Sequence, residues 1–246
     1  MPGVRVSSGG IFDQNTGIAS CRFMVYWIYQ CKKGTVMDIQ IYREKRYEAL
    51  AGSVINGLQA RNMTGYYAKN REEALQLALS LIPEGSRITM GGCMSAHEIG
   101  LISALKEGNY NYIDRDAIDR REAELAAYDA DVFLASANAM TRDGMMVNID
   151  GNANRVSAIA YGPRKVIIIC SMNKVCPDLD SAMKRARNVA AVTNAQRFPM
   201  PTPCKKTGAC MDCLVPDDIC CQMLITRRSF HRGRIHVILV GEDLGF

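Results

Sequence analysis

The sequence has no apolar run long enough to cross a membrane, and its N-terminus lacks the elements of a secretory signal. The longest apolar stretch near the start, Phe23–Tyr29, is far shorter than the roughly 20 residues that a spanning helix needs. A charged start, an apolar stretch and a small-residue cleavage site are not found together there. We therefore expect a cytoplasmic protein, in whose reducing surroundings a disulfide framework is disfavoured.

Charge of one sign is not in large excess. The 246 residues carry a formal net charge of +5, and +3 of it lies in residues 1–36, from four basic residues less one aspartate. The remaining +2 does not predict a nucleic-acid surface. Repeats and low-complexity segments are also lacking. With 48% hydrophobic and 22% charged residues, the composition is that of an ordinary globular protein.

Histidine is scarce, with three in the chain. His97 lies beside Glu98 in the first turn of a predicted helix, and a lone histidine is more often structural than catalytic. His231 and His236 lie near the C-terminal cysteines and are candidate metal ligands. Because His236 begins a predicted strand, packing is the simpler role for it.

Cysteine, by contrast, is plentiful: the chain has ten, and several gather in its last fifth. Gly208 and Pro216 keep this stretch out of regular structure, so that the sulfurs can converge on one ion. The spacing matches neither a ferredoxin run nor a pair of C-x-x-C knuckles. Cys221 is a fifth ligand or a substitute, and buried or disulfide-paired cysteines are the alternative. The predicted metal ligands, separated by five, two and six residues, are Cys204, Cys210, Cys213 and Cys220.

Helix and strand signals alternate from Met37 onward. The V-I-I-I run within Lys165–Cys170 is continuously β-branched and needs both faces covered. The alternation predicts an α/β fold with a mainly parallel sheet flanked by helices. A Pro-, Gly- and Cys-rich insertion at about 193–234 reads as irregular and precedes the last strand. The expected helices are at about 38–61, 70–82, 95–106 and 178–191, and the expected strands at Gly65–Ala68, Arg87–Met90, Val132–Ala135, Lys165–Cys170 and His236–Val240.

Residues 1–36 lack periodicity and are interpreted as a leader outside the single domain, which spans residues 37–246. The peptide Lys32-Lys33-Gly34 would be encoded by a purine run that resembles a bacterial ribosome-binding site just ahead of the Met37 codon. We hypothesise that Met37 is the true start. N-terminal sequencing of the protein expressed from its native gene tests this, and a mature chain beginning at Met1 or Pro2 would refute it.

Two glycines and a helix start follow the strand that ends near Met90. Gly91 and Gly92 allow a tight turn, and Ser95 with Glu98 fits a capping box. Exposed N–H groups in such a turn favour a phosphate or a carboxylate. Plain turn chemistry is the alternative. Cys93, inside the turn, is either a nucleophile or a small buried residue.

A hairpin signal, Asp143-Gly144, precedes a second polar turn rich in amides. Arg155, at the head of the following helix, is well shaped to hold a carboxylate or phosphate. The alternative is a turn with Asx caps and a surface arginine. Asn173 and Lys174 directly follow the core strand, and open α/β sheets place their sites at the carboxyl ends of strands. The turn also holds Asn148, Asp150, Gly151, Asn152 and Asn154.

Several motifs in order resemble the lactate-utilisation (LUD) domain family. They are N-A-M-T-R-D-G-M-M-V-N-I-D-G-N-A-N-R-V-S-A-I-A-Y-G-P-R-K-V, then S-M-N-K-V-C-P-D-L-D-S-A, T-P-C-K-K-T-G-A-C-M-D-C and the closing G-E-D-L-G-F. The resemblance covers about residues 37–246. It implies a fold of the sugar-phosphate isomerase and CoA-transferase class (NagB/RpiA/CoA transferase-like).

The same resemblance implies a part in bacterial oxidation of lactate to pyruvate, together with iron–sulfur oxidoreductase subunits as partners. Individual catalytic residues are not defined in the family, so candidate ligand-binding positions are carried over instead. These are expected to hold a small anionic metabolite at the carboxyl edge of the sheet. They are Gly91, Gly92, Ser95, Asn138, Asn148, Asp150, Asn154, Arg155, Asn173 and Lys174.

The chain departs from isomerases of this fold class, where a Gly-Ala-Asp stretch supplies a catalytic carboxylate. The matching stretch is Ser136-Ala137-Asn138, and an amide cannot perform that proton transfer. Sugar-phosphate isomerisation is therefore disfavoured. No glutamate nucleophile of the CoA-transferase kind is recognisable either, since Glu98 and Glu122 lack a distinctive context.

The sequence thus predicts an accessory or electron-transfer subunit in oxidation of L-lactate or a related 2-hydroxy acid, with an iron–sulfur cluster on the four cysteines. One alternative is a transferase or hydrolase acting on a phosphorylated or CoA-linked metabolite, with Zn²⁺ as a structural ion. A second alternative is a non-catalytic ligand-binding protein.

Overall fold

The computed structural model describes residues 39–246. The predicted leader, residues 1–36, and the suspected start at Met37 lie outside the described residues. Arg43–Phe246 form one compact unit. None of its helices is both long and apolar enough to cross a membrane.

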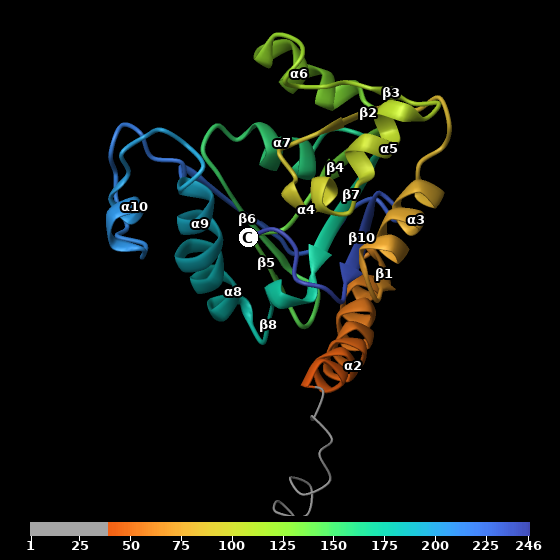
Figure 1. Cartoon of the computed structure of the whole chain (residues 1–246), viewed down its shortest axis with the longest axis horizontal. Coiled ribbons are helices and arrows are strands. Elements are labelled where there is room, and N and C mark those ends of the chain that lie inside the picture. The colour runs from red at the N-terminus through yellow and green to blue at the C-terminus, as the bar shows by residue number, and fades with distance from the viewer. Residues whose placement is uncertain (1–38) are drawn as a thin grey trace, which may run out of the picture. The chain divides into compact units, whose positions relative to one another are not determined.

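A six-stranded sheet forms the centre of this unit, and every neighbouring pair of strands in it is parallel (Figure 1). The strand order is β1-β10-β7-β4-β2-β3. This confirms the predicted α/β class with a mainly parallel sheet. The strands are β1 (Thr64–Ala68), β2 (Arg87–Met90), β3 (Asn111–Tyr112), β4 (Val132–Ala135), β7 (Lys165–Ser171) and β10 (Ile235–Val240).

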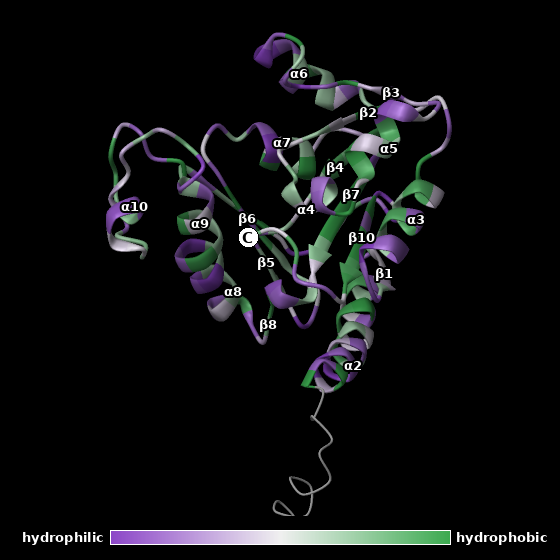
Figure 2. Ribbon diagram, in the orientation of Figure 1, coloured by the Kyte–Doolittle hydropathy of each residue, from purple (hydrophilic) through white to green (hydrophobic). Residues whose placement is uncertain are grey.

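Both faces of the sheet are buried, as the β-branched run in β7 requires. Val166 and Ile168 pack into a core cluster with residues of helices α2 and α7, whereas Ile167 and Ile169 pack into a second cluster with α3, α4 and α5. Figure 2 shows the central strands as a hydrophobic band. The alternation of side chains across a strand therefore divides the core in two.

The helices begin and end largely where the sequence places them. Asn70 caps α3 by accepting a hydrogen bond from the Glu73 amide, and α3 ends before Pro83. The expected helix at 178–191 begins after the cap Asp178 and passes through a π-helical stretch, Ala186–Ala191. The helices are α2 (Ile39–Ala60), α3 (Arg71–Leu81), α4 (Met94–Glu98), α5 (Leu101–Glu107), α6 (Arg120–Ala126), α7 (Asn154–Ala160), α8 (Leu179–Arg185), α9 (Val192–Ala195) and α10 (Pro203–Thr207).

The helix expected at 95–106 is two helices, and the capping box predicted for its start is wrong. Gly100 adopts φ 78°, a left-handed conformation that ends α4 and starts α5. Helix α4 begins at Met94 after Cys93, which makes no side-chain cap. Ser95 therefore lies inside the helix, and Glu98 accepts a hydrogen bond from Gly245 N instead.

A second, four-stranded sheet packs between the main sheet and α8, in the order β8-β5-β6-β9. Its centre is the predicted hairpin at Asp143-Gly144, which joins β5 to β6 as an antiparallel pair. The sheet itself was not expected, because its outer strands give weak signals. The segment at 193–234, predicted to be irregular, contributes β9 and α10. The strands are β5 (Ala139–Thr141), β6 (Met146–Asp150), β8 (Val175–Cys176) and β9 (Gln222–Thr226).

Helix α2 approaches the hairpin turn so closely that glycine is required on both sides. A Cβ at Gly57 would lie 2.4 Å from the carbonyl of Asp143, and one at Gly144 would lie 2.7 Å from Leu58 N. Gly144 also adopts φ 87°. The close approach places the second sheet against the helix that covers the first.

We predict opposite effects for two glycine substitutions in α2. Gly57→Ala should destabilise the protein by about 1 to 3 kcal/mol, because its Cβ meets backbone atoms that have little room to move. Gly52→Ala has no atom within 4 Å of the new Cβ and should stabilise by up to about 1 kcal/mol through helix propensity. Urea denaturation of both variants measures the difference. Equal stabilities would contradict the close packing of α2 on the hairpin.

Candidate functional site

Four neighbouring strands of the main sheet end at one edge, and each is followed by a residue of the candidate site. Strand β2 leads to Ser95, β4 to Ser136, β7 to Lys174 and β10 to Gly245. Because these strands are parallel and adjacent in the order β10-β7-β4-β2, their carboxyl ends meet. Residues from distant parts of the chain therefore converge there.

Lys174 is buried, with 2% of its surface exposed. Its Nζ donates to Ser136 Oγ at 3.2 Å, and it forms no ion pair within residues 39–246. Burial lowers the pKa of Lys174, because desolvation penalises the charged ammonium. The buried thiols of Cys170 and Cys93 oppose this lowering of the pKa, Arg185 adds to it, and Glu98 opposes it more weakly.

The Ser95 hydroxyl lies beside Lys174 and has no hydrogen-bond partner. Ser95 is 1% exposed, and its Oγ is one of few buried side-chain oxygens in the described chain that remain unpaired. Gly245 covers both groups. A Cβ at that position would lie 2.8 Å from Lys174 Nζ and 2.9 Å from Ser95 Oγ. The ammonium and the hydroxyl thus point toward one place under the C-terminal segment.

Arg185, from the end of α8, brings a second positive charge to this edge. Its Nη1 donates to Asn138 O at 2.6 Å and to Phe246 O at 3.3 Å, and its Nε donates to Asn173 O at 3.3 Å. Asn138 O and Asn173 O are backbone carbonyl groups, and the third acceptor is a main-chain oxygen of Phe246, the last residue of the sequence. Lys174, by contrast, is buried beside a neutral hydroxyl and has no counter-ion within the described residues, although buried charged groups are normally paired.

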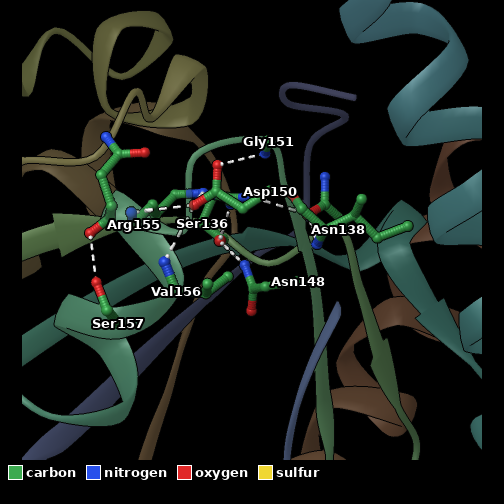
Figure 3. Close-up of polar contacts among 10 residues, drawn as sticks. Ser136, Asn138, Asn148, Asp150, Gly151, Arg155, Val156 and Ser157 are labelled. Carbon is green, nitrogen blue, oxygen red and sulfur yellow. Dashed lines mark hydrogen bonds and ion pairs between the residues drawn. The ribbon is translucent and has the colours of Figure 1, made fainter. Parts of the chain in front are cut away.

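Arg155 lies in a different setting, because protein atoms already surround its guanidinium (Figure 3). Its Nη2 donates to Ile149 O at 2.6 Å and to Asn138 Oδ1 at 3.2 Å, and its Nη1 donates to Ser136 O at 3.3 Å. The Asp150 carboxylate lies 3.9 Å from Nε. Burial lowers the pKa of Arg155, although Asp150 opposes the shift. Its contacts join the two sheets.

The amide-rich turn predicted from the sequence is held together by its own side chains. Asp150 accepts hydrogen bonds from the backbone amides of Gly151, Arg155 and Val156, which fixes the start of α7. Asn148 donates to Ser136 O at 2.8 Å, while its Oδ1 has no partner. Figure 3 shows these groups gathered around Ser136. Ser136 therefore links the turn to Lys174.

The glycine turn after β2 packs against the side chain of Arg155, which fills the space beside Gly91. A Cβ at Gly91 would lie 2.6 Å from Arg155 Cγ and 2.8 Å from Phe133 Cζ. Gly91 and Asn154 line one small pocket. Gly92 adopts φ 69°. Burial raises the pKa of Cys93 to about 11, so its thiol is protonated at neutral pH and suits packing better than nucleophilic attack.

The four predicted cysteine ligands lie in one neighbourhood. Cys204 is in α10, Gly208 ends that helix with φ 70°, and Cys220 packs beside the second sheet. Burial, Asp218 and then the thiolates of the other three cysteines raise the pKa of Cys220 to about 12. Within residues 39–246 the side chains do not form a ready-made metal-binding group of three or more His, Cys, Asp or Glu.

The donor set of this neighbourhood fits a thiophilic metal. Four sulfurs satisfy the coordination of Zn²⁺ or of an iron–sulfur cluster. Arg187, in the π-helical stretch, donates to Cys210 Sγ at 3.6 Å and pairs with Asp212. A cation beside a cysteine stabilises its thiolate, which is the form that binds metal. The remaining cysteine of the segment, Cys221, is exposed.

Sequence reasoning missed three residues of this edge: Ser136, Arg185 and Gly245. Ser136 follows a buried strand and begins the stretch that matches a catalytic stretch of isomerases, but neither signal made it a candidate, and Arg185 lies in a basic helix whose orientation the sequence does not fix. Gly245 belongs to the closing G-E-D-L-G-F, but that motif gave no hint that it folds back over Lys174.

The fold and its site define an α/β protein with polar groups at the carboxyl edge of a parallel sheet. The sequence profile of the LUD domain matches residues 52–240, more than half of the chain. The chain therefore belongs to the LUD domain family. No curated protein matches it significantly.

The solved structures that are similar to the chain include the following two. One is a DUF162 family protein from Deinococcus radiodurans, with 10% identity and a TM-score of 0.48, covering 79% of this chain and 98% of that one. The other is eIF2B delta from Chaetomium thermophilum, with 18% identity and a TM-score of 0.31, covering 71% of this chain and 64% of that one.

We predict that Arg155→Met lowers the free energy of unfolding by about 3 kcal/mol, because it leaves the buried carboxylate and several carbonyls without their donor. Arg87→Met, at a more exposed ion pair with Asp129, is the matched control and should cost less than about 1 kcal/mol. Chemical denaturation measures both. If Arg155→Met lowers the free energy of unfolding no more than Arg87→Met does, Arg155 does not join the two sheets as described.

Proposed function

We propose that this protein is an electron-transfer or accessory subunit in the oxidation of L-lactate or a related 2-hydroxy acid, and that it acts with iron–sulfur oxidoreductase subunits. Membership of the LUD domain family supports the metabolic setting. The observation that carries the electron-transfer part is the gathering of four cysteines beside one arginine. Those cysteines, proposed to hold an iron–sulfur cluster, are Cys204, Cys210, Cys213 and Cys220.

An iron–sulfur cluster, when bound, would transfer single electrons and so could carry away, one at a time, the two electrons that oxidation of a hydroxy acid releases. The chain's own part is to present thiolates and to tune their charge. Arg187 places positive charge at Cys210. Hydrogen bonds and positive charge near a cluster raise its reduction potential, because they stabilise the more negative, reduced form. Zinc in the same four thiolates would instead stabilise the segment between α9 and β9.

The small anionic metabolite of this proposal is assigned to the carboxyl edge of the sheet. Lys174 and Arg185 supply positive charge there, and Lys174 forms no ion pair within the described chain. The product and substrate of 2-hydroxy acid oxidation are both carboxylates. Positive charge without a protein counter-ion is the complement that such molecules require.

Metal analysis of anaerobically purified protein tests the electron-transfer part. We expect iron and acid-labile sulfide with a broad visible absorption band, both lost in the double variant Cys210→Ser/Cys213→Ser. Cys221→Ser is the matched control: its cysteine is exposed and lies outside the predicted set, so metal should be retained. Zinc alone would make the site structural. Absence of both metals would contradict a metal centre.

A further inference from the structure

The edge of the sheet around Lys174 buries more positive charge than the described chain neutralises. Lys174 donates to a neutral hydroxyl, Ser136 Oγ, and the half-buried Arg185 donates to main-chain oxygens of Asn138, Asn173 and Phe246. Glu98 acts on Lys174 only from beyond ion-pair distance and already accepts a hydrogen bond from the Gly245 amide. A buried cation without a counter-ion is costly, so a missing anion is the simplest account of Lys174.

A second, independent observation lies next to Lys174. The Ser95 hydroxyl is fully buried and has no partner, although it can both donate and accept. An unpaired buried hydroxyl lowers the stability of the folded protein, and a substitution of the serine by alanine would remove that cost. A Cβ at Gly245 would lie within 3 Å of both Ser95 Oγ and Lys174 Nζ, so the two groups face the same place. One oxyanion can satisfy both groups.

We propose that Lys174, Ser95 and Ser136, with Arg185 at their side, form a binding site for one small carboxylate. Lys174 donates a hydrogen bond to a carboxylate oxygen of the ligand, and the unpaired hydroxyl of Ser95 donates a second one. Arg185 adds positive charge at longer range. The choice of a 2-hydroxy or 2-oxo acid within that class rests on the proposed function. The site itself rests only on the contacts and burial above.

The C-terminal segment Glu242–Phe246 covers this site and must move for a ligand to enter. Gly245 occupies the point at which Lys174 and Ser95 meet, with φ 58°. Several side chains hold the segment down, among them Glu98, which accepts a hydrogen bond from Gly245 N at 2.7 Å. Ser171 Oγ donates to Glu242 O at 2.6 Å, Arg185 donates to Phe246 O, and Arg71 pairs with Glu242 at 2.7 Å. These are individual polar contacts that a ligand for the same cations can replace.

Isothermal titration of the full-length protein with sodium L-lactate, sodium pyruvate and sodium phosphate tests the site, with sodium chloride at matched ionic strength as the blank. We expect saturable binding of the carboxylates. Lys174→Met should abolish it, and Ser95→Ala should weaken it roughly threefold to tenfold, as the loss of one hydrogen bond predicts.

Thermal unfolding of the free variants checks folding. Ser95→Ala should leave the apparent Tm unchanged or higher, because it removes an unpartnered group.

Two control variants make the same chemical changes elsewhere. Lys165→Met alters a lysine at the other end of β7, whose Nζ donates to Leu81 O. Thr226→Val removes another buried, unpartnered hydroxyl in the second sheet. Both should bind carboxylate as the unchanged protein does. If they lose binding as well, the effect is not specific to the site and the proposal fails.

The remaining outcomes separate this inference from the proposed function. Carboxylate binding by a protein that holds no metal would support the site and overturn the electron-transfer part. Phosphate binding without carboxylate binding would overturn the assigned ligand class. Binding that persists in Lys174→Met, or no binding of any anion, would overturn the site even if iron and sulfide are present.

Discussion

The buried guanidinium of Arg155 is the interaction on which the geometry of this edge depends. It reaches Ser136 O beyond the end of β4 and Ile149 O in β6, and so fastens the main sheet to the second one. Gly91 leaves room for its alkyl stem, and Asp150 fixes the first turn of the helix that carries it. With its backbone held in this way, Ser136 can present its hydroxyl to Lys174. An arginine that sequence reasoning assigned to a ligand is thus engaged by the protein itself, and the cations left for a ligand are others.

Those other cations explain how the parallel sheet and the chemistry are connected. The carboxyl ends of four adjacent strands deliver Ser95, Ser136, Lys174 and Gly245 to one place, which is a consequence of strand order. Charge that is buried without a counter-ion opposes folding, so its presence indicates a use. The cysteine segment follows α8 and α9 in the sequence and is separate from this edge. The chain therefore combines a polar edge of a parallel sheet with a cysteine-rich segment.

Much of the main sheet was predictable, because its central strands are continuous apolar runs and its helices carry caps and proline stops. Strand β4 is apolar throughout, and β7 contains a β-branched run. The second sheet was not, since β8 and β9 are short or half exposed and owe their state to pairing with the hairpin. Within the site, Lys174 was predictable from its place after a core strand. The convergence of Ser95 and Lys174 under Gly245 depends on strand order and on a C-terminal segment that folds back. No local pattern in the sequence encodes either.

The most direct test of the account is the pKa of Lys174, measured by NMR with ¹³C-labelled lysine and assigned with Lys174→Met. Burial without a counter-ion lowers the pKa of this ammonium below its usual range, and a bound carboxylate raises it again by favouring the charged form. The account predicts a lowered value in anion-free protein and a rise on adding L-lactate or pyruvate. An ordinary lysine pKa that no carboxylate changes would contradict it.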